Sequence, residues 1–273
     1  MISTLVSLLS LGAFQFTLAL PTAPSAGCTR ELLQAHTDTY IAAQTAGDPS
    51  ALLAIASPNL IYTEDFVARN LSKGVLTTPL HINHNRSILD TTQCATYTEL
   101  IITSATTPRV IGTQLRFSPG SGAQLLQAES LVTQPGDWGF NATGALYYAS
   151  REDGLWTPIP TPDQDSRQVI QAAADAYLDL FNDPTVKVPW GTPCDRLEGS
   201  FYTGNFSATD SCNVGVPSGV NIFNRKYVID EVLGTVDCLV TFGTRPDSHE
   251  FRVEKGKIRF VHTLTVMRNV TAY

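Results

Sequence analysis

Histidine is the residue type in this sequence best suited to chemistry at neutral pH, and His262 is the most informative of the five. It lies in the segment GKIRFVHTLTV, whose apolar residues occupy alternate positions: Ile258, Phe260, Leu264 and Val266. This period of two predicts a half-buried strand with His262 on its apolar face. There His262 is either a core histidine with satisfied hydrogen bonds or a titratable group inside a pocket.

Two tyrosines and a glutamate add hydrogen-bonding groups to the candidate site. Tyr62 and Glu64 lie in IYTEDF, and Tyr202 lies in the similar stretch FYTG. Each phenol either points into a pocket as a donor or packs in the core with its hydroxyl in water. We expect His262, Tyr62 and Tyr202 to donate hydrogen bonds to a substrate, and Glu64 to contact it.

A tryptophan and an ion pair complete the candidates. Trp190, between Pro189 and Gly191, either walls an apolar ligand site or packs on a nearby disulfide. Arg196 and Glu198 are either a solvated ion pair or a pair that orients an anion or carbonyl at a pocket mouth. We expect Trp190 to be the wall and Arg196 the orienting cation.

Several other chemistries lack their sequence motifs. The chain has no Gly-X-Ser-X-Gly, no His-Glu-X-X-His, no phosphate-binding glycine loop and no dinucleotide fingerprint. HINH (81–84) contains two histidines, but its polar surroundings indicate a surface turn, and we expect neither a metal nor a cofactor. A net charge of -7 without a basic cluster argues against a nucleic-acid partner.

The elements that must position these residues come in two copies. RELLQAHTDTYIA, which begins at Arg30, matches RQVIQAAADAYLD, which begins at Arg167. The last hairpins of the two halves, GAQLLQAESLV and GKIRFVHTLTV, also correspond. We therefore predict a tandem duplication, with one repeat at residues 28–160 and the other at residues 161–273.

The duplication pairs candidate residues of the two repeats. Tyr62 matches Tyr202 in the aligned stretches, and Glu129 falls at the position of His262. The same core position is therefore ionisable in both copies. This recurrence strengthens the prediction that His262 has a function beyond packing.

Each repeat begins with a helix and continues as strands. Asp165 and Gln168 have the spacing of a capping box, and Pro184 predicts that the helix ends near residue 182. KYVIDEV, TVDCLVTF, HEFRVE and KIRFVHTLTV then read as strands, with EKGK (254–257) as a hairpin turn. One long helix followed by a meander indicates an α+β fold, in which a curved antiparallel sheet wraps a helix.

The N-terminal segment predicts entry into the secretory pathway. Residues 1–20 have the short apolar run of a signal peptide, with cleavage after Ala19 or as late as Ala26. No later stretch is long and apolar enough to span a membrane. Five sequons predict glycosylated surface turns: Asn70, Asn85, Asn141, Asn205 and Asn269.

The five cysteines fit an oxidising compartment. Cys28 pairs naturally with Cys94 in the first repeat, and Cys194 with Cys212 in the second, although the sequence permits other connectivities. Cys238 lies in a strand-like segment and is expected to be a buried free thiol. The predicted protein is therefore a secreted or lumenal, disulfide-bonded glycoprotein.

The repeated pattern resembles the SnoaL-like cone fold, also called the nuclear transport factor 2 fold. More specifically, VPWGTPCDRLEG, NRKYVIDEVLGTV, PDSHEFRVEKGKIRFVHTLTV and VIGTQ are similar to a secreted fungal family. The resemblance implies two cone-shaped repeats. It extends to the hetero-Diels-Alderases of fungal tropolonic sesquiterpene (meroterpenoid) biosynthesis. The resemblance to these enzymes implies a cofactor-independent cyclase that joins a tropolone o-quinone methide to a humulene-type sesquiterpene.

Two other functions fit the residues. One is a secreted, non-catalytic protein that binds an apolar small molecule. The other is acid–base isomerisation, which requires a carboxylate beside His262, with Glu64 or Asp230 as candidates. A tailoring enzyme of secondary metabolism is the leading prediction, since a pericyclic step needs apolar partners held in near-attack geometry and no nucleophile.

Overall fold

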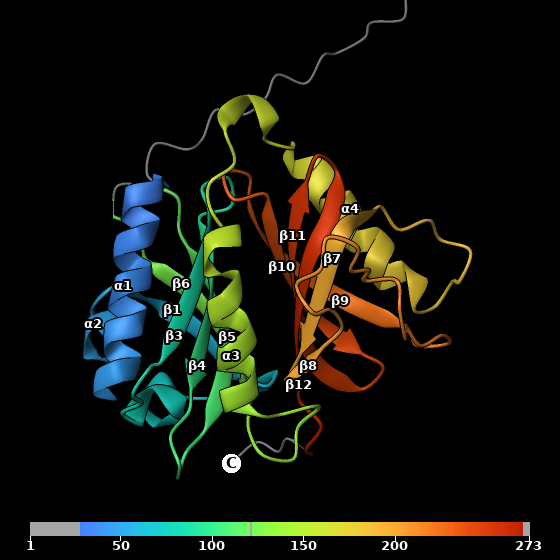
Figure 1. Ribbon diagram of the computed structural model, residues 1–273. Helices are drawn as coiled ribbons and strands as arrows, with labels where there is room; N and C mark the ends of the chain where they lie inside the picture. The colour runs from blue at the N-terminus through green and yellow to red at the C-terminus, as the bar shows by residue number, and fades with distance from the viewer. Residues whose placement is uncertain (1–27, 121, 270–273) are drawn as a thin grey trace, which may run out of the picture.

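The computed structural model describes residues 28–120 and 122–269, in which two six-stranded sheets face each other (Figure 1). The first sheet contains β1 (Ala56–Glu64), β2 (Val67–Ala68), β3 (His84–Asp90), β4 (Ala95–Ile102), β5 (Arg109–Phe117) and β6 (Leu125–Thr133). The second contains β7 (Trp190–Glu198), β8 (Phe201–Tyr202), β9 (Ile222–Asp230), β10 (Thr235–Phe242), β11 (Arg245–Glu254) and β12 (Lys257–Thr265). The predicted signal peptide, residues 1–20, lies outside the described residues.

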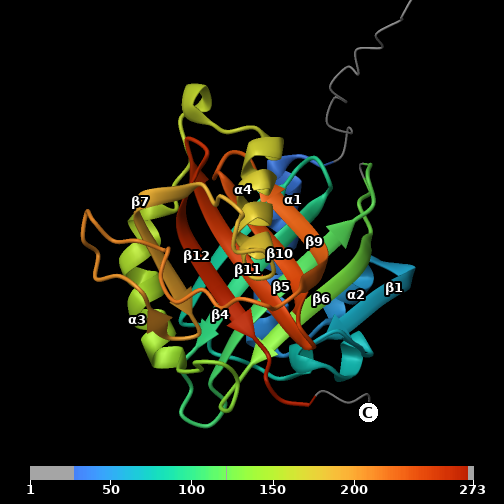
Figure 2. The same cartoon turned by 90° about the vertical axis from the view of Figure 1, so that its right-hand side faces the viewer.

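Helices cover the outer faces of both sheets. The first sheet is covered by α1 (Arg30–Ala46), followed by the short α2 (Ser50–Ala54). The second is covered by α4 (Arg167–Leu180), which lies in front of β10 and β11 in Figure 2. Along one edge of the two sheets runs α3 (Ala142–Glu152), a helix that the sequence reading did not predict. Four short 3₁₀ turns complete the fold: η1 (Leu71–Lys73), η2 (Val75–Thr77), η3 (Asp153–Leu155) and η4 (Thr161–Asp163).

The two sheets have equivalent strand orders, β2-β1-β6-β5-β4-β3 and β8-β7-β12-β11-β10-β9. In each, the first long strand pairs in parallel with the last, and every other pairing is antiparallel. The fold is therefore α+β with two mixed sheets, an arrangement compatible with two repeated units. The prediction of purely antiparallel sheets is wrong at β1–β6 and β7–β12, because residue alternation within a strand does not depend on the direction of its neighbour.

Local signals around α4 and the last hairpin are largely confirmed. The helix is capped by Ser166, whose Oγ accepts from the Val169 amide, one residue later than the predicted capping box. Asp165 instead accepts from the Gly256 amide and ties the helix start to the hairpin turn. In that turn Lys255 and Gly256 have φ values of 53° and 68°, as a two-residue hairpin loop requires.

Both predicted disulfides are present, Cys28–Cys94 and Cys194–Cys212, and Cys238 is a buried free thiol. Among the described residues, no helix has the length and apolar character needed to cross a membrane. All five sequon asparagines are exposed: Asn70, Asn85, Asn141, Asn205 and Asn269. Their exposure is compatible with the predicted glycosylation.

Two reciprocal clamps hold the repeats together. Arg30, at the start of α1, donates to both carboxylate oxygens of Asp230 at the end of β9, each at 2.8 Å. Arg167, at the start of α4, donates to Asp90 at the end of β3, at 2.8 and 2.7 Å. Each repeat therefore fixes the start of its helix to the end of a strand in the other. Arg30 and Arg167, which begin the matching segments of the two halves, thus make equivalent contacts with the opposite repeat.

Candidate functional site

A cavity of about 600 Å³ lies between α4 and the second sheet. Its walls come from α4, β7, β10, β11 and β12, from the loop at residues 213–220, and from the segment that follows β6. Much of the lining is apolar or aromatic: Trp138, Tyr177, Phe181, Pro217, Val220, Phe242 and Met267. A cavity of this size and composition suits a small, largely apolar molecule.

His249 and Asp247 form a buried pair in this lining. They lie two residues apart on β11, so the strand turns both toward α4. The distance from His249 Nδ1 to Asp247 Oδ2 is 3.0 Å, and their exposed fractions are 2% and 0%. Asp247 Oδ1 also accepts a hydrogen bond from Thr265 Oγ1 at 2.7 Å. A histidine beside a carboxylate in an apolar cavity is suited to proton transfer.

A second pair, Arg196 and Glu198, lines the cavity from β7. Arg196 Nε lies 3.2 Å from Glu198 Oε1, and Arg196 Nη2 donates to the carbonyl oxygen of Val214 in the adjacent loop. Tyr177 of α4 lies with its ring 5.5 Å from the His249 ring. Burial raises the pKa of Tyr177, against an opposing effect of Arg196, so its phenol stays protonated and can donate a hydrogen bond.

Among the ionisable residues of this lining, three buried polar atoms make no hydrogen bond of good geometry: Arg196 Nε, Asp247 Oδ2 and His249 Nδ1. The ion-pair contacts described above bring them close to a partner without aligning donor and acceptor. Unsatisfied buried polar groups are uncommon because they cost free energy, and catalytic contacts often align only when a substrate is bound. Their convergence on one cavity indicates a ligand-binding site.

The first repeat does not carry these groups. Strand register makes the equivalent residues Thr113 for His249, Ile111 for Asp247 and Tyr62 for Arg196. The η1–η2 segment also packs against this part of the first sheet, where the amide of Val75 donates to Glu64 and Leu76 joins the core. The acid–base residues are therefore a feature of the second repeat.

His262 lies on the same face of β12 as Phe260 and Leu264, as the alternation predicted, but this face meets the first sheet rather than α4. The register of β12 shifts between Ile258 and Phe260, so Ile258 and Val261 both pack against the α4 core. After this irregularity His262 faces the first sheet, where its Nε2 lies 2.8 Å from Glu152 Oε2. His262 therefore does not line the cavity beneath α4, and the β-bulge puts Ile258 on the face opposite to it.

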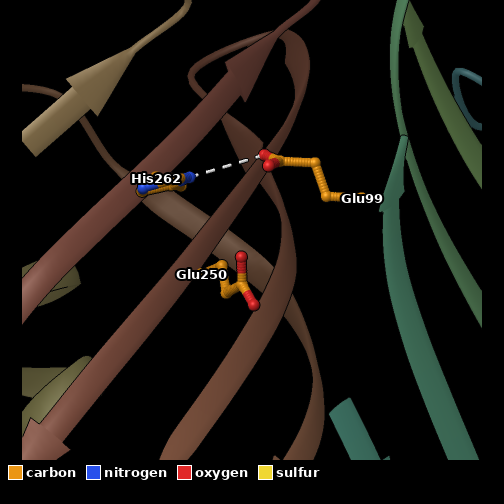
Figure 3. Close-up of side chains that lie close together, drawn as sticks. All are labelled: Glu99, Glu250 and His262. Carbon is orange, nitrogen blue, oxygen red and sulfur yellow. Dashed lines mark ion pairs between the residues drawn. The ribbon is translucent and has the colours of Figure 1, made fainter. Parts of the chain in front are cut away.

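Figure 3 shows His262 and Glu250 on the second sheet, with Glu99 reaching toward them from the first. Burial alone would lower the pKa of His262, but the carboxylates of Glu152 and Glu99 together outweigh it and raise that pKa to about 9. Burial likewise opposes ionisation of Glu99, yet Arg86 and His262 lower its pKa to about 2. The repeats therefore meet across a buried network of charged groups.

Glu99, Glu250 and His262 place three possible metal-ligand atoms within 4.8 Å of one another. The Arg86 guanidinium already lies among them. Its Nη2 is 2.7 Å from Glu250 Oε2, 2.8 Å from His262 Nδ1 and 3.5 Å from Glu99 Oε1. A cation held there would have to displace this guanidinium, so the residues fit an internal ion pair better than a metal.

Three more predicted residues, Tyr62, Glu64 and Tyr202, lie away from the cavity. Tyr62 is buried in the first repeat, and its hydroxyl donates to Glu64 Oε1 at 2.5 Å. Tyr202 lies on β8, where its hydroxyl donates to Glu152 Oε1 at 2.8 Å and its ring stacks on Tyr148. The sequence pairing of Tyr62 with Tyr202 is also wrong. By register Tyr62 corresponds to Arg196, because the stretch IYTEDF aligns with the strand before FYTG.

Of the remaining predicted residues, one lines the cavity and the others do not. Arg196 lines the cavity as expected. Trp190 packs edge-on against Tyr177, with ring centroids 5.6 Å apart. It therefore contacts a lining residue without lining the cavity itself. Asp230 belongs to the clamp with Arg30 rather than to a site beside His262. In HINH, His84 Nε2 lies 2.6 Å from Asp153 Oδ1.

Asp247, His249 and Tyr177 are the lining residues whose roles the sequence analysis missed. Asp247-Ser248 reads locally as turn chemistry, but both residues pair with β10 inside β11. The available signal was the spacing in PDSHEFRV, which places Asp247, His249 and Phe251 on one face of a strand. Tyr177 reads as a core residue and is fully buried, as well as lining the cavity.

Comparison with known proteins adds little about chemistry. Residues 163–265 match a family described as "Domain of unknown function (DUF8021)". The matched region begins just before α4 and ends with β12, so it covers the repeat that contains the cavity. No curated protein matches the chain significantly. The second repeat is therefore similar to a family without an assigned function.

Proposed function

We propose that this protein is a cofactor-independent enzyme that binds an apolar small molecule between α4 and the second sheet and moves a proton through His249. The observation that carries the proposal is the buried His249–Asp247 pair, facing a cavity of about 600 Å³ with largely apolar walls. The first repeat lacks both residues at the equivalent positions.

The reaction class that fits best is isomerisation next to a carbonyl group. Asp247 stabilises the imidazolium form that His249 reaches when it accepts a proton, and His249 can return that proton to another atom of the substrate. Arg196 and Tyr177 supply donors for the oxygen on which charge develops. A positioned general base of this kind contributes on the order of 10²–10⁴ to the rate.

Cyclisation is the second candidate, and the number of apolar and aromatic side chains in the lining favours it. An intermolecular hetero-Diels-Alder reaction of the kind implied by the fungal resemblance needs two apolar partners held together and a donor on a carbonyl oxygen. Arg196 would be that donor, in place of His262, Tyr62 and Tyr202. The proposal also includes cone-shaped repeats and secretion through a cleaved signal peptide, with which the two disulfides are consistent.

The test compares glycosylated, disulfide-intact wild type with His249→Gln, Asp247→Asn and the exposed control His81→Gln. One assay follows conjugation of a bicyclic β,γ-unsaturated ketone by its absorbance. The other follows adduct formation between a tropolone quinone-methide precursor and a humulene-type alkene by chromatography. We expect His249→Gln to lose about 10²–10⁴ of the isomerisation rate, with His81→Gln unchanged.

The outcomes separate the alternatives. Loss of isomerisation in His249→Gln with retained ligand binding supports acid–base catalysis. Acceleration of the adduct alone, sensitive to Arg196→Met, supports the cyclase. Saturable binding of the ketone by wild type without turnover in either assay favours the non-catalytic binding protein and rejects the enzyme proposal.

A further inference from the structure

Two large apolar residues of the cavity lining are exposed to solvent at its mouth. Trp138 is 48% exposed and Met267 is 37% exposed, whereas Tyr177, Asp247 and His249 deeper in the lining are nearly or fully buried. Trp138 belongs to the loop after β6, and Met267 to the segment after β12. One part of the mouth is therefore built from two chain segments that are more than a hundred residues apart. Pro217 and Thr244, on two other segments, are exposed lining residues as well.

These two segments are tied to each other. The Trp138 amide donates to the carbonyl oxygen of Thr265 at 3.3 Å, and the Met267 amide donates to Asp137 Oδ1 at 2.8 Å. Arg245 also donates to the carbonyl oxygen of Met267. Asp137 thus lies next to one mouth residue and holds the other by its amide.

Arg268 connects this pair of segments to the first sheet. Its guanidinium contacts the carboxylates of Asp137 and Asp65, and its Nη2 donates to the carbonyl oxygen of Val132 at 2.8 Å. Asp65 lies in the turn between β1 and β2, is 4% exposed, and accepts from the Val132 amide at 2.8 Å. The position equivalent to Asp65 in the second repeat is Gly199, so the contact exists on one side only.

We propose that Arg268 is a positioning residue for the cavity mouth: by binding Asp65 and Asp137 it holds Trp138 and Met267 in place and so controls the entry and exit of the ligand. The first repeat, which lacks the His–Asp pair, then has a role in the same site. This inference rests on the proposed ligand cavity, but the contacts that carry it do not depend on which reaction occurs there.

The environment of Asp65 adds a pH dependence. Burial raises its pKa to about 6, against the opposing effects of the Val132 amide and Arg268, while Asp137 and Glu64 add to the increase. Arg109 also lies near Arg268 and Asp137, and Arg245 lines the same surface pocket as Asp65 and Arg268. Below about pH 6 Asp65 becomes neutral, and Arg268 keeps only Asp137 as a charged partner. Ligand exchange is therefore expected to be faster in mild acid than at pH 7.5.

The experiment measures dissociation of Nile red, an apolar fluorescent probe, from the full-length protein at pH 7.5 and pH 5. The variants are Arg268→Met, Arg268→Lys and Asp65→Asn, with Arg259→Met as a control for loss of an arginine elsewhere on the second repeat. We expect Arg268→Met and Asp65→Asn to dissociate the probe about tenfold faster than wild type at pH 7.5, with little further change at pH 5. Arg268→Lys should recover part of the wild-type rate.

A second measurement separates failure of the positioning role of Arg268 from failure of the cavity as a ligand site. Amide hydrogen exchange of the peptides that contain Trp138 and Met267 reports the mouth contacts without any ligand, and should accelerate in Arg268→Met but not in Arg259→Met. Unchanged exchange and an unchanged dissociation rate in Arg268→Met would overturn the positioning role. Faster exchange with no binding of Nile red by wild type would keep the contact but reject the cavity as a ligand site.

Discussion

The paired clamps between the repeats give a prediction whose size follows from the structure. Asp90 is fully buried and accepts five hydrogen bonds: two from Arg167, and one each from the amides of Thr92, Gln93 and Ile229. Asp230 accepts the same set, with two from Arg30 and one each from the amides of Leu89, Val232 and Leu233. Identical bonding at two sites permits a comparison within one molecule.

The two clamps differ in exposure of their arginines. The Arg167 side chain is 16% exposed and that of Arg30 is 32% exposed, so water screens the second pair more strongly. Asp90→Asn is expected to lower the free energy of unfolding by about 3 kcal/mol, because it leaves Arg167 without its counter-charge in a partly buried site. The coupling between Arg167 and Asp90 is expected to be about 2 kcal/mol, and that between Arg30 and Asp230 about 1 kcal/mol.

Urea unfolding of the single variants Asp90→Asn, Arg167→Met, Asp230→Asn and Arg30→Met, and of the two double variants, measures both couplings. Arg259→Met controls for loss of an arginine side chain outside the clamps. Coincident transitions by fluorescence and circular dichroism are required before free energies are compared. A coupling below about 0.5 kcal/mol for Arg167–Asp90, or a larger value for Arg30–Asp230, would refute the reasoning.

Two further predictions concern the charged network between the sheets. Because the folded pKa of His262 is raised to about 9, its stabilising contribution is complete below its ordinary value near 6.5 and is lost as the pH rises toward 9. The melting temperature of wild type should fall over this pH range by an amount that corresponds to at most about 3 kcal/mol. The melting temperature of His262→Phe should change little with pH over the same range. Equal pH dependence in the two proteins would contradict the raised pKa of His262. Arg86→Ala removes the guanidinium that lies among Glu99, Glu250 and His262, so Zn²⁺ should raise the melting temperature of this variant and not of wild type, measured against EDTA. Stabilisation of both proteins by Zn²⁺ to the same extent would show that Arg86 does not govern access to these ligands.

Sequence patterns predicted the elements of the second repeat closely. TVDCLVTF coincides with β10, EKGK forms the expected hairpin turn, and α4 covers the predicted amphipathic helix. These features depend on residues near one another in the chain, which alternation, helical spacing and turn preference record directly. The cysteine pairs were predicted because each falls within one repeat, although Cys28 and Cys94 are 66 residues apart in the chain.

The candidate site was predicted less well. Arg196 was placed correctly, and His262 was grouped correctly with Phe260 and Leu264. Ile258 was assigned to the wrong face, because the irregularity between Ile258 and Phe260 arises where β12 pairs with its neighbours and leaves no mark in the alternation. Asp247 was assigned to a turn on local preference, whereas pairing with β10 extends the strand through it. Both errors come from treating strand register as a local property.

The sequence by itself determined that the chain contains two related units, each with an amphipathic helix followed by strands, because duplication and periodicity are written in neighbouring residues. Only the tertiary structure decided which unit has the cavity and which residues face it. In the first repeat the η1–η2 segment packs against Tyr62 and Glu64, and in the second the equivalent face remains open beside His249. That difference depends on how segments distant in the chain fill the space between helix and sheet, and the sequence pattern of either element alone is the same in both cases.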